Sequence, residues 1–289
     1  MTVVPQRANL DLKIWTWIDM VIALVIILLL IIAVVVYISL IMPRSVDGAD
    51  MDMLSCDFAH RGLWNETVPE NSLAAFMLAA KTGYGIELDI QLSKDGRMVV
   101  FHDYNLKRMC GVNRRVSDMT LEELKELRLL GTNQQIPTLV EVLQLIDGKV
   151  PLLIELKGED LDTTLCSKVA KVLDNYRGVF CIESFNPIIL SWFKSYRPRY
   201  ARGQLVTDCI KEKRKGNKLL SFALSNMLLN FLSRPDFIAI NKKYQGKLSF
   251  KICTGLFKAK AFVWTVKTPK EYVLAHRSGK YTIFEKINP

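Results

Sequence analysis

The chain has 289 residues, half of them hydrophobic, and a formal net charge of +10 at neutral pH. This length holds one large domain or two small ones. The six cysteines form no CxxC pair and lack disulfide-framework spacing, so the composition disfavours a disulfide-stapled fold and indicates buried free thiols. The positive charge comes without a nucleic-acid motif or a stripe of interleaved aromatic and basic residues, and we predict no nucleic-acid partner.

The first element expected along the chain is a membrane-spanning helix. Residues 20–42 contain no charged side chain and are numerous enough to cross a bilayer, and Trp15 and Tyr37 lie near the ends of this stretch, as interfacial aromatics do. The stretch is longer than the apolar part of a signal peptide, and no clean cleavage site follows it. We predict an N-terminal tail and transmembrane anchor over 1–42 and a polar linker over 43–53.

The charges beside the anchor bear on its orientation. Arg7 and Lys13 precede the apolar stretch, whereas Arg44 alone follows it closely. This excess favours an N-terminus inside the cell and an extracytoplasmic large domain. Free cysteines favour a reducing compartment instead, so the sequence predicts a single-pass protein of the cell membrane and leaves its orientation open.

Charge is divided unevenly over the rest of the chain. Residues 43–186 carry 16 basic and 22 acidic side chains, whereas residues 187–289 carry 21 and 5. A basic second half beside a membrane anchor indicates an anionic partner, and membrane lipid headgroups fit that description. The basic run at 211–218 is either the solvated start of a helix or part of such a lipid contact.

From residue 54 onward, apolar runs typical of strands alternate with segments of helical periodicity. The first helix after the anchor is expected to be capped by Asn71 or Ser72 and to end at Gly83. Further helices are expected at 161–174, 187–195, 217–232, 246–258 and 269–276. Strands are expected at 54–59, 85–92, 98–101, 150–156, 179–185, 201–206, 237–240, 261–266 and 281–287.

This alternation predicts an α/β fold, a (β/α)8 TIM-like barrel over 54–289. The strand candidates exceed by one the number that such a barrel needs, and the turn at 94–97 is too short to connect parallel strands. Either 85–92 and 98–102 form a hairpin or one run lies outside the barrel wall. Residues 104–148 contain two helix signals, and we predict that they form a small helical insertion over the barrel mouth.

Ionisable residues inside the apolar runs indicate a reactive site. Glu87 and Asp89 occupy alternate positions of one strand and therefore point to the same face, and Glu155 lies in another strand. Carboxylates in such places are costly unless they are paired or bind a metal, and the active sites of barrels lie at the carboxyl ends of strands. Two of the three histidines, His60 and His102, also close apolar runs. The pattern favours acid–base chemistry with a hard divalent cation, Mg²⁺ or Ca²⁺.

Simpler interpretations exist for each of these residues. His60 or His102 alone would more often be a structural histidine than a catalyst. Lys157 shares the strand face of Glu155, where it could meet an anionic oxygen. The alternative is an ordinary ion pair, either between Glu155 and Lys157 or between a glutamate and Arg61. The combination of residues, rather than any one of them, favours an enzyme.

These residues fall into short motifs whose order is similar to that of the glycerophosphodiester phosphodiesterases. The motifs are His60-Arg61-Gly62, Pro69-Glu70-Asn71-Ser72, Glu87-x-Asp89, Val99-Val100-Phe101-His102-Asp103, Glu155-x-Lys157, Ser184-Phe185 and Trp264-Thr265-Val266. The resemblance covers about residues 56–266 and implies a (β/α)8 barrel that hydrolyses glycerophosphodiesters to glycerol 3-phosphate and an alcohol with a divalent cation. It implies acid–base catalysis by His60 and His102, metal binding by Glu87, Asp89 and Glu155, and phosphate binding by Arg61 and Lys157.

Two positions depart from the pattern of that family. Lys267 stands where an asparagine is usual, and Glu285 only loosely replaces an aspartate of the closing strand. Independently of these positions, three alternatives stay open: a lysophospholipase D-type activity on lysolipids, a non-catalytic lipid-headgroup-binding module, and a related barrel phospholipase that cleaves inositol lipids. The sequence leaves the oligomeric state open.

Overall fold

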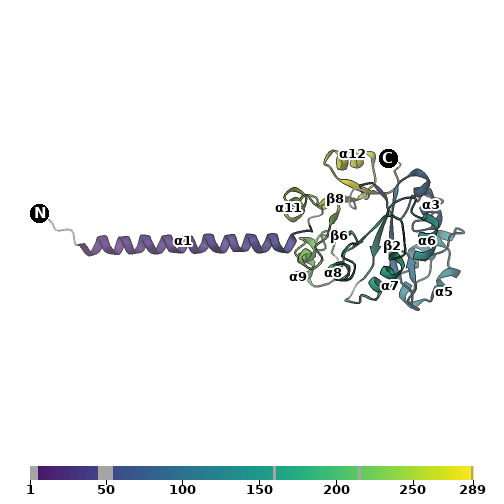
Figure 1. The fold of residues 1–289 in the computed structure, drawn as a ribbon, viewed down its shortest axis with the longest axis horizontal. Helices are drawn as coiled ribbons and strands as arrows, with labels where there is room; N and C mark the ends of the chain where they lie inside the picture. Colours follow the sequence, from purple (N-terminus) through teal and green to yellow (C-terminus); the bar gives the residue numbers. More distant parts are fainter. Residues whose placement is uncertain (1–5, 45–54, 159–160, 214–215, 288) are drawn as a thin grey trace.

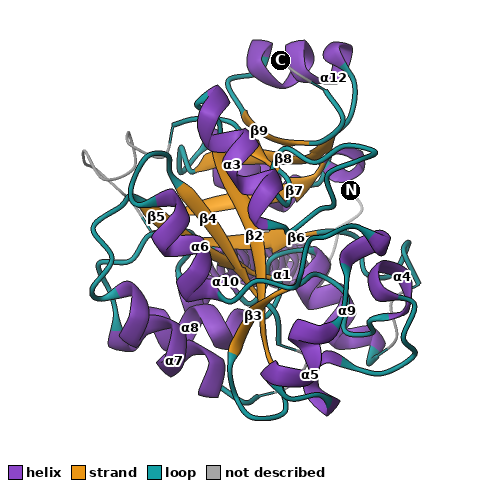
Figure 2. Cartoon of the chain, turned by 90° about the vertical axis from the view of Figure 1, so that its right-hand side faces the viewer, coloured by secondary structure: helices purple, strands orange, loops and turns teal. Residues whose placement is uncertain are grey.

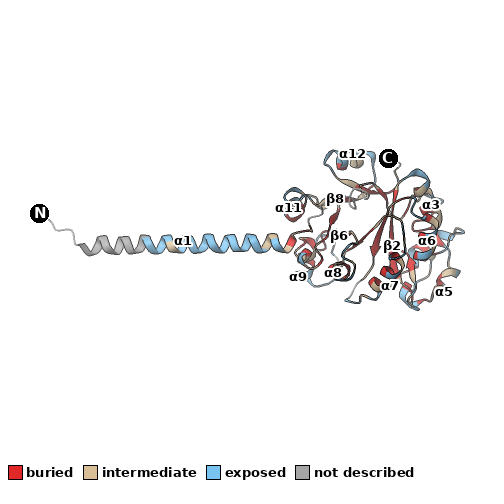
Figure 3. Ribbon diagram, in the orientation of Figure 1, coloured by how far each residue is buried: buried red, intermediate tan, exposed pale blue. Residues whose placement is uncertain are grey.

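The computed structural model describes residues 6–44, 55–158, 161–213, 216–287 and 289. Most of the predicted linker lies outside these residues. Helix α1 (Gln6–Ile41) projects from a compact α/β body as one continuous helix (Figure 1). Its segment Trp17–Ile41, 25 residues long, is apolar enough to cross a membrane by length and composition, and the described side chains along it are mostly exposed (Figure 3).

The body is a closed parallel barrel. Eight strands pair side by side in the order β1-β9-β8-β7-β6-β5-β4-β2, and a parallel pairing of β1 with β2 closes the ring (Figure 2). The eight strands are β1 (Phe58–Ala59), β2 (Gly85–Leu92), β4 (Leu152–Leu156), β5 (Phe180–Ser184), β6 (Arg202–Val206), β7 (Phe237–Asn241), β8 (Lys260–Val266) and β9 (Tyr281–Phe284). The predicted (β/α)8 fold is confirmed.

The additional strand is explained by a hairpin. β3 (Met98–Val100) pairs antiparallel with β2 and with no other barrel strand among the described residues, so it extends the sheet outside the closed ring. The first barrel strand is also shorter than the predicted run 54–59. The side chain of Asp57 accepts a hydrogen bond from the backbone N–H of Thr282 at 2.7 Å, and ladder pairing between β1 and β9 begins only at the next residue.

Helices surround the ring. They are α3 (Leu73–Thr82), α7 (Thr164–Leu173), α8 (Pro187–Tyr196), α9 (Lys218–Ser225), α10 (Asn230–Ser233), α11 (Leu248–Gly255) and α12 (Pro269–Arg277). Ser72 caps α3 by accepting a hydrogen bond from Ala75, and Gly83 ends it with a left-handed backbone, as the sequence predicts. The single helix expected over 217–232 is divided in two, because buried Met227 adopts a positive φ of 58° and turns the chain between α9 and α10.

The segment between β3 and β4 contains two different parts. The short helices α4 (Lys107–Cys110) and α5 (Leu121–Glu126) surround a small apolar cluster of their own. Helix α6 (Leu139–Ile146) contacts α3 and leads into β4. α6 thus occupies the place of a barrel crossover helix, while the part before it forms the insertion.

Aromatic side chains fill one end of the barrel. The ring of Phe262 contacts those of Phe58 and Phe237, with centroid distances of 5.7 and 5.1 Å. Gly203 makes room for this layer, since a Cβ there would lie 1.9 Å from the Phe237 ring. With this end of the ring filled by apolar side chains, the polar side chains of the strands gather toward the opposite, carboxyl end.

Helix α1 ends directly on the barrel. The last carbonyls of a helix lack partners within the helix, and here the barrel supplies them. The side chain of Asn230 donates to the carbonyl of Ile41 at 3.0 Å, and Arg234 donates to that of Met42 at 3.1 Å. These contacts fix the end of α1 beside α10.

Candidate active site

The acidic side chains singled out in the sequence meet on two neighbouring strands. Glu87 and Asp89 lie on β2, and Glu155 lies on β4 opposite Asp89 in the parallel register. All three are buried, and one carboxylate oxygen from each lies within 4.8 Å of the others. Alternation along β2 and the pairing of β2 with β4 therefore turn the three carboxylates toward one point.

A fourth carboxylate, which the motifs did not single out, adjoins this cluster. Glu183 lies on β5 opposite Glu155. It is 1% exposed, and its Oε2 has no hydrogen-bond partner among the described residues. Burial, together with the nearby carboxylates of Glu155 and Asp89, raises the pKa of Glu183 well above its ordinary value. The signal in the sequence was a charged residue inside the apolar run 179–185, the same kind of signal that identified Glu155.

Two cations lie against the cluster. Lys157 Nζ is 2.8 Å from Asp89 Oδ1 and 2.7 Å from Glu155 Oε1. Arg61 Nε is 3.5 Å from Asp89 Oδ2, and the backbone N–H of Arg61 donates to Glu87 Oε2 at 2.8 Å. The ion pairs that the sequence offered as a simpler interpretation are thus present, alongside the carboxylate cluster rather than in place of it.

The charges of this region do not balance, and the carboxyl pKa values respond. The cluster has four buried carboxylates, and these two cations contact it. Burial, followed by the charges of Asp89 and Glu183, raises the pKa of Glu87 well above its ordinary value. Burial acts on Asp89 in the same direction, but Lys157 and His102 outweigh it and hold the pKa of Asp89 well below the usual range. A further positive charge beside Glu87 would relieve this repulsion.

His60 is held by Glu285, the residue that follows the last barrel strand. His60 Nδ1 lies 2.7 Å from Glu285 Oε2. Because an ionised carboxylate only accepts hydrogen bonds, Nδ1 carries the proton and Nε2 keeps the lone pair in the neutral ring. Burial lowers the pKa of His60, and the hydrogen bond to Glu285 partly offsets that effect. Lys267 forms an ion pair with the other oxygen of Glu285, so the two residues that depart from the family pattern contact each other and support His60.

His102 is held by its neighbour in the chain. His102 Nδ1 lies 2.6 Å from Asp103 Oδ1, and Asp103 accepts a hydrogen bond from Arg108 Nε at 2.6 Å. Arg108 also donates to Glu70, which accepts from Arg61 at 2.7 Å. A continuous set of charged contacts therefore connects the insertion with the site.

Both histidines line one small cavity of about 130 Å³. The charged side chains around it include Arg61, Glu87, Glu155 and Glu183, and its apolar walls are Phe185, Leu205, Trp264 and Ile283. The structure thus places two imidazoles, a guanidinium and several carboxylates around the same small space. The third histidine, His276, contacts Asp57 at 3.0 Å instead and does not line this cavity.

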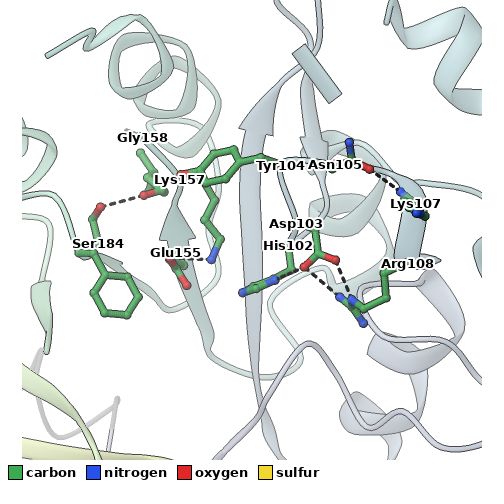
Figure 4. Close-up of a pocket in the computed structure, with 12 residues that line it drawn as sticks. His102, Asp103, Tyr104, Asn105, Lys107, Arg108, Glu155, Lys157, Gly158 and Ser184 are labelled. Carbon is green, nitrogen blue, oxygen red and sulfur yellow. Dashed lines mark hydrogen bonds and ion pairs between the residues drawn. The ribbon is translucent and has the colours of Figure 1, made fainter. Parts of the chain in front are cut away.

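A larger open cleft of about 1110 Å³ adjoins the cavity and shares His102, Glu155 and Phe185 with it. Figure 4 shows Lys157 and Glu155 on one side of this cleft and His102 on the other, with Asn105, Lys107 and Arg108 beyond His102. The cleft is therefore much larger than the cavity that it adjoins.

Comparison with known proteins shows the family to which the chain belongs. A model of the glycerophosphoryl diester phosphodiesterase family matches residues 60–284. A glycerophosphodiester phosphodiesterase of Caldanaerobacter subterraneus is 40% identical over 160 residues, which are 51% of this chain and 65% of the relative. A rat lysophospholipase D is 35% identical over 137 residues, which are 43% of this chain and 42% of that protein. The chain thus spans less than two thirds of the length of these two curated relatives.

Solved structures give the same result. An Oleispira antarctica phosphodiesterase, solved with its product sn-glycerol 3-phosphate, superimposes with a TM-score of 0.67 and 25% identity over 82% of this chain and 95% of that one. The corresponding values for a glycerophosphodiester phosphodiesterase of Thermotoga maritima are 0.62 and 27%, over 79% and 93%. Since the family match covers most of the barrel, the chain belongs to the glycerophosphoryl diester phosphodiesterase family.

Proposed function

We propose that the protein is a metal-dependent phosphodiesterase that hydrolyses glycerophosphodiesters to glycerol 3-phosphate and an alcohol. The observation that carries this proposal is the single cavity lined by both supported histidines, an arginine and the carboxylate cluster. A non-catalytic headgroup-binding module would not need two imidazoles that are each fixed by a carboxylate.

The carboxylate cluster suits a hard divalent cation. Glu87, Asp89 and Glu155 would hold it, because carboxylate oxygens are the ligands that Mg²⁺ and Ca²⁺ prefer and because the buried acidic groups outnumber the cations around them. When bound, such an ion would offset the negative charge that grows on the phosphoryl oxygens. Arg61 and Lys157 would add fixed positive charge on the same side and orient the phosphate.

The two histidines would move the protons. One removes the proton of the attacking glycerol 2-hydroxyl, whose oxygen forms a bond to phosphorus while the bond from phosphorus to the leaving oxygen breaks. The other gives its proton to that leaving oxygen, and one water molecule then opens the cyclic phosphate to yield glycerol phosphate. Glu285 and Asp103 orient His60 and His102 through Nδ1, so that Nε2 of each ring is the atom that exchanges the proton.

Product analysis tests the proposal. Full-length protein in detergent should release sn-glycerol 3-phosphate from glycerophosphocholine in the presence of Mg²⁺ or Ca²⁺. We expect His60→Ala and His102→Ala each to lower kcat about 10²–10⁴-fold, whereas His276→Ala, the matched control outside the cavity, should retain activity. A folded wild-type protein without turnover on any glycerophosphodiester would disprove the proposal.

We also infer that α1 anchors the protein in a membrane as a single span. Its apolar segment is exposed to the surroundings over most of its length and ends where the barrel begins. The flanking basic residues support an N-terminus inside the cell. Protease accessibility of the barrel in sealed vesicles tests this orientation, and a span that is absent from the mature chain would refute the anchor.

A further inference from the structure

We propose that an apolar cavity beside α9 binds the acyl chain of a lysophospholipid and that α9 forms the entrance to it from the membrane. The inference rests on the proposed function and deepens it by naming the substrate class and the place of its chain. This cavity has a volume of about 130 Å³ and is separate from the one that contains the histidines. Its lining is mostly apolar, from Phe185, Leu205, Cys209, Leu220 and Leu224, and is completed by Gly216 and the uncharged polar residues Thr207, Asn217 and Ser221.

The apolar cavity adjoins the catalytic cavity. Phe185 and Leu205 line both of them, so the two spaces share a wall. Phe185 also lines the open cleft. The cleft therefore adjoins the catalytic cavity on the side of the insertion, and the apolar cavity adjoins it on the side of α9.

The two outer spaces differ in chemistry. The cleft is bordered by charged side chains such as Asp103, Lys107 and Arg108, whereas no charged side chain of the described residues lines the cavity beside α9. A lysophospholipid carries a polar headgroup on one side of its phosphate and a glycerol with one acyl chain on the other. The cleft fits the headgroup, and the apolar cavity fits the beginning of the chain.

Helix α9 is apolar on two faces. Leu220 and Leu224, one turn apart, line the cavity. Leu219 is 76% exposed and Phe222 is 49% exposed. A surface helix of a soluble protein keeps a polar outer face, and the only charge within α9 is Lys218 at its first position. An outer face of this composition fits contact with lipid.

The position of α9 relative to α1 brings α9 close to the membrane surface, where a lipid substrate would be available. The span Trp17–Ile41 has 25 residues, a length of about 38 Å, and the hydrocarbon core that it would cross measures about 30 Å. The difference leaves only the depth of the headgroup layer between the core and the barrel. α1 is fixed to Asn230 of α10, which follows α9 in the chain, and Figure 1 shows α9 on the side of the body from which α1 projects. A single-chain lipid in the adjacent leaflet could therefore enter beside α9.

The first test is a substrate series. Full-length protein in nanodiscs is assayed on glycerophosphocholine, which has no chain, and on lysophosphatidylcholines of increasing chain length below their critical micelle concentrations. Each methylene that enters an apolar site contributes about 0.8 kcal/mol, which corresponds to about a fourfold rise in kcat/KM. We expect such a rise until the cavity is filled and a plateau beyond it.

The second test uses variants. Leu220→Ser and Leu224→Ser make the wall of the cavity polar. Leu256→Ser is the matched control, because Leu256 is an exposed leucine at the end of α11 (63%) that does not line the cavity. We expect the ratio of kcat/KM for lysophosphatidylcholine to that for glycerophosphocholine to fall about ten- to a hundredfold in the wall variants and to stay within twofold in the control.

The outcomes separate this inference from the proposed function. A kcat/KM independent of chain length, or an equal loss in Leu256→Ser, overturns the acyl-chain site while the phosphodiesterase function stands. If neither substrate is turned over, the proposed phosphodiesterase function is disproved, and the acyl-chain site is then tested by calorimetric measurement of lysophosphatidylcholine binding. Chain-length-dependent binding that Leu220→Ser weakens would then support it, and an absence of binding would overturn it as well.

Discussion

Replacement of Glu285 by glutamine tests how the carboxyl-terminal strand supports His60. The hydrogen bond between His60 Nδ1 and Glu285 Oε2 measures 2.7 Å, and the two side chains are only 16% and 7% exposed. Glutamine keeps the shape and removes the charge, so the variant loses a charge-assisted hydrogen bond worth about 1.5–3 kcal/mol. Because His60 becomes more positive as it takes up a proton, this loss should lower kcat about 10- to 100-fold.

The pH dependence gives a second readout with a defined sign. Burial lowers the pKa of His60 and Glu285 raises it, so Glu285→Gln should move the limb of the pH–rate profile that His60 controls to lower pH. Burial raises the pKa of Glu285 itself, but the hydrogen bond from His60 and the ion pair with Lys267 outweigh it and bring this pKa to about 2. Its ionised form therefore stabilises the fold above its ordinary pKa of about 4.3, and this contribution is lost as the pH falls toward 2. The variant should lack that acid-dependent loss.

The assay is the profile of kcat and kcat/KM for glycerophosphocholine between acidic and alkaline pH at saturating metal, with urea unfolding at several pH values. Asp174→Asn is the control, since it breaks an ion pair with Arg197 of comparable length, 2.6 Å, that does not involve His60. A Glu285→Gln profile that superimposes on the wild type, with kcat within twofold, would refute the reasoning.

Three further predictions concern the metal, the buried charges and the packing of the barrel. A chelator should abolish hydrolysis, Mg²⁺ or Ca²⁺ should restore it, and the restoring ion should raise the Tm of the wild type but not of Glu87→Gln; equal shifts would argue against this cluster as the metal site. Lys157→Met leaves buried carboxylates unpaired and should lower the free energy of unfolding in metal-free buffer by about 3–5 kcal/mol, so an unchanged urea midpoint would contradict the ion pairs. Gly203→Ala places a Cβ 1.9 Å from the Phe237 ring and should lower the free energy of unfolding by about 1–3 kcal/mol. In Gly255→Ala the new Cβ meets no described atom within 4 Å, so this variant should raise the free energy of unfolding by about 0.4–1 kcal/mol. Thermal unfolding compares these two glycine variants directly.

The local patterns of the sequence were sufficient for most of the fold. The cap at Ser72 and the glycine at 83 bounded α3 because both act within one turn of the helix. The alternation of charged and apolar residues along β2 gave the shared face of Glu87 and Asp89, because side-chain direction in a strand depends only on the backbone. The short turn after β2 likewise excluded a parallel pairing of the two runs that it joins, since so few residues cannot lead a chain back to a parallel neighbour.

Contacts between distant parts of the chain were decided only by the tertiary structure. Glu285 reaches His60 across 225 residues of sequence, and Glu183 joins the carboxylate cluster only because β5 lies beside β4. The place where α1 meets α10, and hence which face of the barrel adjoins α1, also depends on closure of the ring. The sequence by itself identified Glu87, Asp89 and Glu155 as side chains that are costly to bury without a partner. Which partners balance their charges depends on the strand order, and that order results from packing of the whole chain.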